Sequence, residues 1–332
     1  MERIFREYLD LLSNLNFRKF QIELSQKMYD ALAQGYVTNA TEVSLVTKLV
    51  EAINNSRFNK FKFYAHKIHG ARSYVEFNYR DKPMTKEIAD MVIISIASYK
   101  RERVLQKITF IQNKVAHNRN WTIDEEQLFL LKNFPKFSGN KGIFKSFLNE
   151  EIVFLNHSRC LGSFGLFMDP GEMIFLSAPL LSELKKDKGI TIDNIKLTET
   201  AANMGTRNFF FPFIFDRHFG EEFLHSMYKY MREYAFFTPF ISNGSLPFLN
   251  NSTFSRDIYD FTRDWTQFNI GEPTYAFGNI INPVLDKFTN FLLRAIGIQE
   301  HIDLPLEGIG GEFNNKLALF VMHIDLGREK QG

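Results

Sequence analysis

Two long apolar runs joined by a short charged turn constrain the fold of this chain most tightly. The first run is KEIADMVIISIAS and the second is VLQKITFIQNKVA, with YKRER between them. Their length and their Ile and Val content predict two paired strands. Upstream, ARSYVEFNYR alternates between polar and apolar residues and predicts a further strand, ended by a turn at Asp81-Lys82-Pro83. The centre of the chain is therefore expected to be a β-sheet.

Helical periodicity surrounds these strands. Residues 1–36 read as helical, and a second helix is expected from about Thr41 to Asn54, with Glu42 in its first turn. Residues 120–132 resume helical spacing until Pro135 stops it. A fourth strand is expected at EEIVFLNHS. The order across residues 40–156 is thus helix, strand, strand, strand, helix, strand, which predicts an α/β fold.

The remaining chain mixes a hairpin, helices and a last strand. SFGLFMDPGEMIFLSA predicts a hairpin that turns at Asp169-Pro170-Gly171. Helices are expected from about residue 203, at FGEEFLHSMYKYMREYAFF and NIINPVLDKFTNFLLRAI, and a strand at LALFVMHIDL. Charged residues interrupt the apolar pattern near 185–205. We therefore expect a domain over residues 1–190 and a mostly helical C-terminal domain over 191–332, for recognition or oligomerisation.

Charge is unevenly distributed along the chain. The net charge is +2, yet residues 57–119 carry 14 Lys and Arg against 5 Asp and Glu, a balance of +9. The rest of the chain therefore sums to −7. A basic block in a nearly neutral chain is typical of proteins that bind a polyanion such as nucleic acid. A solvated, lysine-rich edge of a sheet would leave the same trace.

Composition excludes several classes of protein. The 332 residues are 45% hydrophobic and 23% charged, which suits a globular protein with a large core. The single cysteine, Cys160, excludes an internal disulfide and a cysteine-based zinc site. The N-terminal MERIFREYLDLLSNL is too charged for a signal peptide, and no apolar run is long enough to span a membrane. A soluble cytoplasmic protein without a membrane partner is expected.

Polar residues stand out among the predicted strands and point to metal chemistry. Gln112 and Lys114 are two residues apart on one strand and therefore project from the same face. Asp90 lies in an apolar strand, where a carboxylate is costly unless something satisfies it. An Asp carboxylate and a Gln carbonyl can bind Mg²⁺ or Mn²⁺ together with water and phosphate oxygens. The alternative is that Asp90 caps the end of a strand and Lys114 is an exposed strand lysine.

The motif IAD, ending in Asp90, followed by FIQNK resembles that of the PD-(D/E)XK nuclease superfamily, to which many restriction endonucleases belong. The resemblance covers residues 40–156 and implies a restriction-endonuclease-like mixed sheet flanked by helices. It implies that Asp90 is the metal-binding acid and Lys114 the catalytic lysine. Gln112 replaces the usual acid and looks like the variant of Mrr-type restriction endonucleases. The implied activity is Mg²⁺-dependent cleavage of DNA in prokaryotic restriction or phage defence, as a homodimer or with a partner subunit.

Further positions are assigned with alternatives. Glu42 could be a helix acid beside the metal or a first-turn carboxylate that complements the helix dipole, with Glu51 as its competitor. Glu87 is expected on the other face of the strand from Asp90. Trp121 could stack on a base or anchor the following helix in the core. Phosphate contacts are expected from five residues in loops that flank the central strands, namely Lys100, Arg101, Arg103, His117 and Arg119.

Three functions therefore remain open. The first is a metal-dependent DNA endonuclease. The second is a nucleic-acid-binding module that keeps a nuclease-like fold but has lost activity, with Gln112 as the trace of the loss. The third is an interaction protein whose acidic remainder docks a basic partner.

Overall fold

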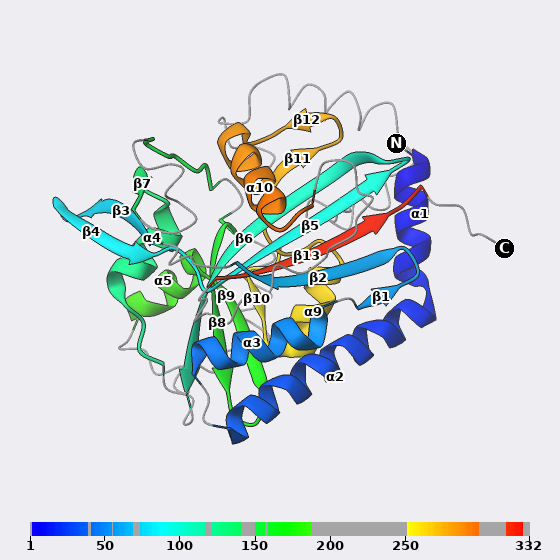
Figure 1. The fold of residues 1–332 in the computed structure, drawn as a ribbon, viewed down its shortest axis with the longest axis horizontal. Coiled ribbons are helices and arrows are strands. Elements are labelled where there is room, and N and C mark those ends of the chain that lie inside the picture. Colours follow the sequence, from blue (N-terminus) through cyan, green and yellow to red (C-terminus); the bar gives the residue numbers. More distant parts are fainter. Residues whose placement is uncertain are drawn as a thin grey trace.

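The computed structural model shows a mixed α/β protein. It describes residues 2–38, 41–54, 56–68, 74–116, 121–140, 150–156, 159–187, 251–298 and 317–327. Two sheets and the helices around them make up this part of the chain (Figure 1). Across these residues, no helix combines the length and the apolar character that a membrane crossing requires.

The chain begins with the helices that its periodicity predicts, namely α1 (Glu2–Ser13), α2 (Leu15–Val37) and α3 (Glu42–Ile53). Thr41 caps the start of α3. Its hydroxyl accepts a hydrogen bond from the backbone N–H of Ser44, and the Ser44 hydroxyl accepts one from the N–H of Thr41. This reciprocal pair satisfies two N–H groups that a helix start leaves open. It fixes Glu42 in the first turn, as expected.

Within the described residues, ten strands form one mixed sheet. Eight lie side by side in the order β1 (Arg57–Phe58), β2 (Phe61–Lys67), β13 (Ala318–Asp325), β5 (Met91–Tyr99), β6 (Glu102–Ala116), β8 (Gly162–Met168), β9 (Glu172–Ser177) and β10 (Phe254–Ser255). The other two are β11 (Glu272–Ala276), which pairs with β6, and β12 (Asn279–Ile280), which pairs with β11. β13 is parallel to β5 and β6 is parallel to β8, while the other pairs are antiparallel.

A smaller sheet stands beside the large one. Its strands are β4 (Lys82–Glu87), β3 (Tyr74–Tyr79) and β7 (Phe137–Gly139), in that order. The β3–β4 hairpin projects from the body of the molecule at the left of Figure 1. The predicted first strand therefore exists, but it pairs outside the sheet that holds β5 and β6. KEIADMVIISIAS is not one strand, because β4 ends at Glu87 and β5 begins at Met91.

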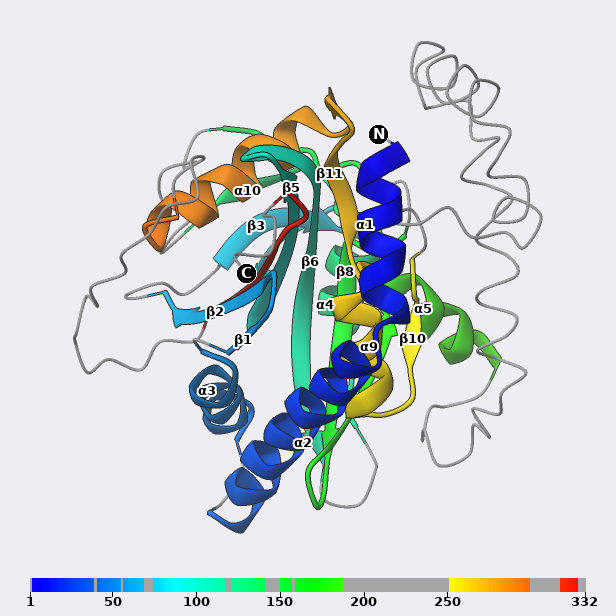
Figure 2. The ribbon, with the colours of Figure 1, turned by 90° about the vertical axis from the view of Figure 1, so that its right-hand side faces the viewer.

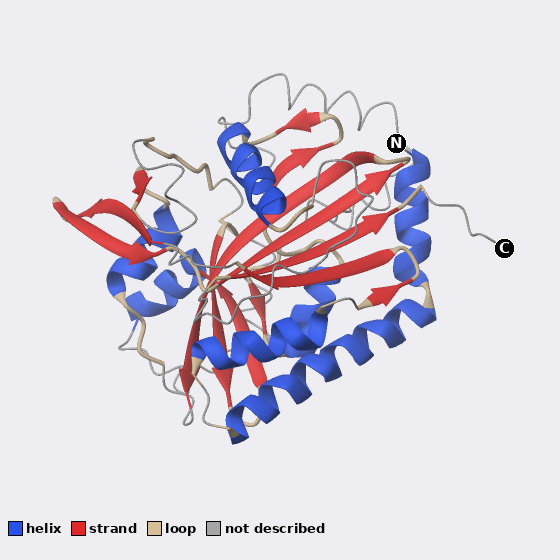
Figure 3. Ribbon diagram, in the orientation of Figure 1, coloured by secondary structure: helices blue, strands red, loops and turns tan. Residues whose placement is uncertain are grey.

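Helices cover both faces of the large sheet (Figure 3). The later ones are α4 (Glu125–Asn133), α5 (Ala178–Asp187), α9 (Ile258–Thr266) and α10 (Pro283–Ala295). Alternate strand residues point to opposite faces. Ile94 and Phe110 share a core with α4, α5 and α10, whereas Met91 and Ile111 share one with α1, α2, α3 and α9. Figure 2 shows α1 and α10 on opposite sides of β5 and β6.

The prediction of a strand at EEIVFLNHS is wrong. In its described part, residues 150–156, Ile152 makes an isolated bridge with Phe137 and no strand forms. Phe154 is buried, and its ring centroid lies 5.8 Å from that of Phe110. The apolar side chains of this segment thus enter the core from a loop. The strand beside β6 is β8, the first arm of the hairpin predicted at Asp169-Pro170-Gly171.

The C-terminal region is not mostly helical where it is described, which corrects the prediction. α10 and β13 were expected, but β10, β11 and β12 were not. These strands are two to five residues long, too short to show a period of two. The helix predicted at FGEEFLHSMYKYMREYAFF lies outside the described residues, as does most of the boundary near 185–205. Strands β9 and β10, from either side of that boundary, pair with each other.

Candidate functional site

The strand β6 changes neighbours along its length, and the predicted site lies at the change. β6 pairs with β5 as far as Ile111 and continues beside β8 to its end. The chain before β5 belongs to the small sheet, so residues 112–116 extend past the start of β5. The strands on the two sides of this point diverge in Figure 1. We call it the fork, and it brings together Asp90, Gln112 and Lys114.

Asp90 is fixed between β5 and β6. It lies one residue before β5 and is 6% exposed. Its carboxylate accepts a hydrogen bond from the side-chain amide of Gln112 and another from the backbone N–H of Asn113, at 2.8 Å. The backbone of Asp90 bonds to both neighbouring strands, through the carbonyl of Ile111 and the N–H of Ala318. These contacts hold the carboxylate at the fork and also suit a residue that caps the start of a strand.

Gln112 is 3% exposed and has one unsatisfied atom. Its Nε2 donates to Asp90, but among the described residues its Oε1 has no hydrogen-bond partner. Buried polar atoms are rarely left unpaired. This unpaired amide oxygen and the neighbouring Asp90 carboxylate are both oxygen ligands of the kind that Mg²⁺ binds.

Lys114 joins this group from the same face of β6. Its ammonium lies 3.8 Å from the carboxylate of Glu42, and the two side chains are 19% and 37% exposed. Lys114 is therefore not the exposed strand lysine of the alternative interpretation. The competing helix acid, Glu51, pairs with Lys48 at 3.1 Å on the surface of α3. Of the two candidates on α3, Glu42 is the one at the fork.

Burial, together with nearby charges, strongly raises the pKa of Asp90. Burial is the main reason that the pKa of Asp90 rises from 3.8 to about 8, and the negative charges of Glu42 and Glu87 raise it further. The hydrogen bond from Asn113 and the charge of Lys114 lower the pKa in part. Three carboxylates and one ammonium thus act at this point, so a divalent cation would balance the charge there.

The residues at the fork fit a divalent cation with few protein ligands. Among the described residues, no group of three or more His, Cys, Asp and Glu side chains is close enough to hold a metal. Mg²⁺ often binds one or two protein groups and keeps water for its other positions. The Asp90 carboxylate and the unpaired Oε1 of Gln112 meet that requirement.

The strand break before β5 also removes the basis for the position predicted for Glu87. Its assignment to the opposite face assumed an unbroken strand from residue 86 to 98. The structure breaks that strand at residues 88–90, so alternation does not relate Glu87 to Asp90. The chain passes from the small sheet to the large sheet between Glu87 and Met91, and the continuous apolar run gives no sign of this change.

The cations predicted to contact phosphate lie far from the fork. Lys100 and Arg101 form the turn between β5 and β6, and the nine residues of β5 separate them from Asp90. At about 3.3 Å per residue, that is about 30 Å. Arg103 serves the fold, since its guanidinium donates to both carboxylate oxygens of Asp286, at 2.8 and 3.3 Å. Lys100 and Arg101 therefore lie in a turn, as predicted, whereas Arg103 lies within β6 and not in a loop.

Several cations of the basic block at residues 57–119 pair with carboxylates in the folded chain. Among the described residues, five of its cations pair with carboxylates from outside the block, as Lys60–Glu7, Arg80–Glu125, Lys86–Asp124, Arg103–Asp286 and Lys114–Glu42. Lys107 is buried, and its ammonium donates to Asn251 Oδ1 and the Phe268 carbonyl. Folding thus neutralises much of the charge counted along the sequence. His117 and Arg119 lie outside the described residues.

Trp121 anchors the segment that leads into α4. Its indole N–H donates to the carbonyl of Phe167 at 3.0 Å, and the ring is buried. It is therefore a core residue and not a base-stacking platform. Close packing of α4 on β8 depends on Gly162, where a Cβ atom would meet the Leu131 carbonyl oxygen at 2.1 Å.

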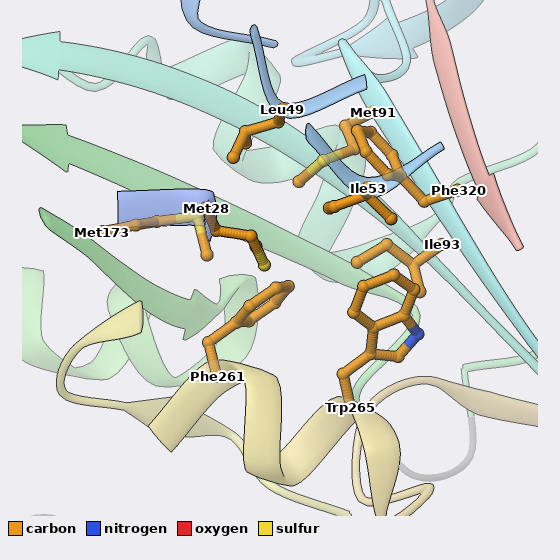
Figure 4. A pocket seen from close by; sticks show the side chains of 9 residues that line it. All are labelled: Met28, Leu49, Ile53, Met91, Ile93, Met173, Phe261, Trp265 and Phe320. Carbon is orange, nitrogen blue, oxygen red and sulfur yellow. The ribbon is translucent and has the colours of Figure 1, made fainter. Parts of the chain in front are cut away.

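A hollow lies in the core on the face of the sheet that α1, α2, α3 and α9 cover. Figure 4 shows its lining, which comes from Met28, Leu49, Ile53, Met91, Ile93, Met173, Phe261, Trp265 and Phe320. These side chains are almost entirely apolar, and the hollow is too narrow to hold a water molecule. It is a packing gap and does not extend the candidate site.

Comparison with known proteins adds no relative to these observations. No protein-family model, no curated protein and no solved structure matches the chain. The candidate site therefore stands on the motif and on the geometry at the fork.

Proposed function

We propose that this protein is a metal-dependent DNA endonuclease of the PD-(D/E)XK kind that acts in prokaryotic restriction or phage defence. The observation that carries the proposal is the convergence at the fork. A buried carboxylate, an unpaired buried amide oxygen and a lysine from one strand meet there, with a helix acid beside the lysine. The mixed sheet with helices on both faces suits the fold that the motif implies.

Each residue at the fork has a role in this proposal. Asp90 and Gln112 hold the cation, Mg²⁺ or Mn²⁺, through one carboxylate and one amide oxygen. When bound, the cation supplies Lewis-acid polarisation of a phosphodiester and a lowered pKa of water. Lys114 orients the attacking water and offsets negative charge that develops on the phosphate. Glu42 holds the Lys114 ammonium in place through their ion pair.

Cutting both strands of a duplex requires two such sites. We therefore propose that the protein acts as a homodimer or with a partner subunit, because closed two-fold pairs are the commonest way to supply a second site. Phosphate contacts must come from groups other than Arg103, which is held by Asp286.

A nucleic-acid-binding module without activity is the second candidate. Two observations favour it. Gln112 brings no charge to a cation, and the hydrogen bonds to the Asp90 carboxylate from Gln112 and Asn113 also suit a purely structural aspartate.

Cleavage of a plasmid in the presence of Mg²⁺ or Mn²⁺ separates these candidates. We expect nicking or linearisation by the wild type and at least about a 100-fold loss in Asp90→Ala. Glu102→Ala, which removes an exposed carboxylate at the far end of β6, is the matched control and should retain activity. Wild-type protein that is inert on plasmid, single-stranded DNA and RNA would end the enzyme proposal. DNA binding that weakens with salt would then support the binding module.

A further inference from the structure

Asn113 connects the two oxygen ligands of the fork through its backbone. It directly follows Gln112 on β6, and its backbone N–H donates to the Asp90 carboxylate at 2.8 Å. The pairing of β6 with β5 ends at Ile111, so this hydrogen bond extends the contact between the two chain segments past the end of the ladder. The backbone at Asn113 therefore sets where Asp90 and Gln112 lie relative to each other.

The side chain of Asn113 points to the opposite face of β6 from those of Gln112 and Lys114. Alternate strand residues face opposite sides, so Asn113 shares its face with Ile111, which packs under α1, α2, α3 and α9. Asn113 is fully buried, and among the described residues neither its Oδ1 nor its Nδ2 has a hydrogen-bond partner. A buried amide without partners is costly, and an apolar side chain would stabilise the fold more. Stability alone therefore does not explain an Asn at this position.

A glycine on β8 makes room for this amide. Gly165 is the Cα partner of Asn113 in the parallel pairing of β6 with β8. A Cβ atom on Gly165 would clash with the Asn113 Oδ1 and would also touch Ile111 Cγ2 at 3.4 Å. The amide oxygen thus occupies the space of a side chain at residue 165, which only glycine leaves open. The two residues are matched, and any larger residue at 165 must displace the amide or the strand that carries it.

We propose that Asn113 is a positioning residue of the cation site, and that its contact with Gly165 fixes the direction in which Asp90 and Gln112 present their oxygens. This inference rests on the proposed function. With its amide seated against β8, the strand cannot rotate about its own axis at the fork. Such a rotation would break the hydrogen bond to Asp90 and turn the Gln112 Oε1 away from the carboxylate. Groups that orient metal ligands typically change metal affinity by about 10- to 100-fold when they are removed.

Titration calorimetry with MnCl₂ on the full chain tests the inference without any nuclease assay. Gly165→Ala places a methyl group against the Asn113 amide, and we expect the Kd for Mn²⁺ to rise about tenfold. Asn113→Ala removes the amide but keeps the backbone N–H, and a rise of about the same size is expected. Gly165→Ala added to Asn113→Ala should have little further effect, because the group that clashes with the new methyl is gone.

Gly327→Ala is the matched control. Its methyl group would clash with the backbone nitrogen of Lys100, which follows the far end of β5. It should therefore lower the melting temperature while the Kd for Mn²⁺ stays unchanged. Should Gly165→Ala fail to fold by circular dichroism, Asn113→Ala decides by itself. A Kd within about twofold of the wild type in that variant overturns the inference.

The outcomes separate this inference from the proposed function. Wild-type protein that binds no divalent cation overturns both. Wild-type binding with an equal affinity in Gly165→Ala and Asn113→Ala overturns the role of Asn113 alone and leaves the nuclease proposal standing. Additive losses in the double variant would also overturn it, because the two residues would then act independently. The same holds for an equal loss in Gly327→Ala, since strain far from the fork would then suffice.

Discussion

Two polar clusters include residues of the strand β6, and they differ in how fully their polar atoms are hydrogen-bonded. Near the start of β6, the Asp286 carboxylate on α10 is surrounded by donors. Its Oδ1 accepts hydrogen bonds from Arg103, Gln106 and Thr274, at 2.8, 3.2 and 3.1 Å. The Arg103 guanidinium also lies 4.0 Å from the ring centroid of Tyr275. We call this cluster the α10 anchor.

The fork, at the other end of the strand, is incomplete by comparison. Among the described residues, it has a buried amide oxygen without a partner and a carboxylate whose pKa is raised mainly by burial. Polar groups that serve the fold alone are normally saturated, as they are at the α10 anchor. The difference suits a structural role for the anchor and supports the ligand that we propose for the fork.

Lys114→Ala should show the largest effect at the fork. It removes the charge that offsets the phosphate and should lower plasmid cleavage at least about 100-fold. Its melting temperature should change little, because the ion pair with Glu42 is partly exposed. Cleavage and thermal melting of the same preparation provide the measurement. A large drop in melting temperature would place Lys114 with the structural residues instead.

Arg103→Ala should show the opposite pattern at the α10 anchor. It leaves Asp286, which is 5% exposed, without its cation. Breaking a buried pair in this way lowers the free energy of unfolding by about 3 kcal/mol. Urea unfolding of Arg103→Ala and of Lys100→Ala, which removes an exposed cation nearby, measures the difference. Equal stability of the two variants would contradict the structural role of the anchor.

Asp90→Asn should stabilise the protein when no divalent cation is present. The folded state raises the pKa of Asp90 from 3.8 to about 8, so between those values it binds more protons than the unfolded state. Stability from this group therefore falls as pH rises from about 4 to about 8. The variant should gain on the order of 2 kcal/mol at pH 8 and almost nothing at pH 4. Urea unfolding in EDTA at both pH values checks this sign.

Gln112→Glu is the most discriminating small change. It restores the acid usual in the PD-(D/E)XK motif and removes the amide that donates to Asp90. We expect Mn²⁺ to bind about tenfold more tightly, because an anionic oxygen replaces a neutral one. Calorimetry measures this affinity. Unchanged or weaker binding would argue that Gln112 faces Asp90 for structural reasons only.

The sequence predicted what depends on local geometry. Gln112 and Lys114 share a face because they are two residues apart on a strand, and Glu42 is fixed by the cap at Thr41. Asp90 was predicted inside a strand that starts at residue 86, whereas it lies one residue before β5. The large mixed sheet with flanking helices was predicted as well.

Contacts between residues far apart in the chain could not be predicted from the sequence. Arg103 was expected to meet phosphate, but its partner Asp286 lies 183 residues away in the sequence. Phe154 was predicted to lie in a strand because its segment is apolar. Loops can also bury apolar side chains in a core, and Phe154 does so from a loop. Nothing local marks the crossing between sheets that places Glu87, since a continuous apolar run suits one strand as well as two.

The position of β13 sets a condition on how the protein assembles. This strand comes from residues 318–325, yet it lies between β2 and β5, and the N–H of Ala318 bonds to the carbonyl of Asp90. During synthesis, the facing edges of β2 and β5 must wait for more than 200 further residues to be made. Contacts so distant in sequence slow folding and leave strand edges exposed meanwhile. The fork is therefore completed only late, and a ribosome-bound chain that lacks β13 has no finished site.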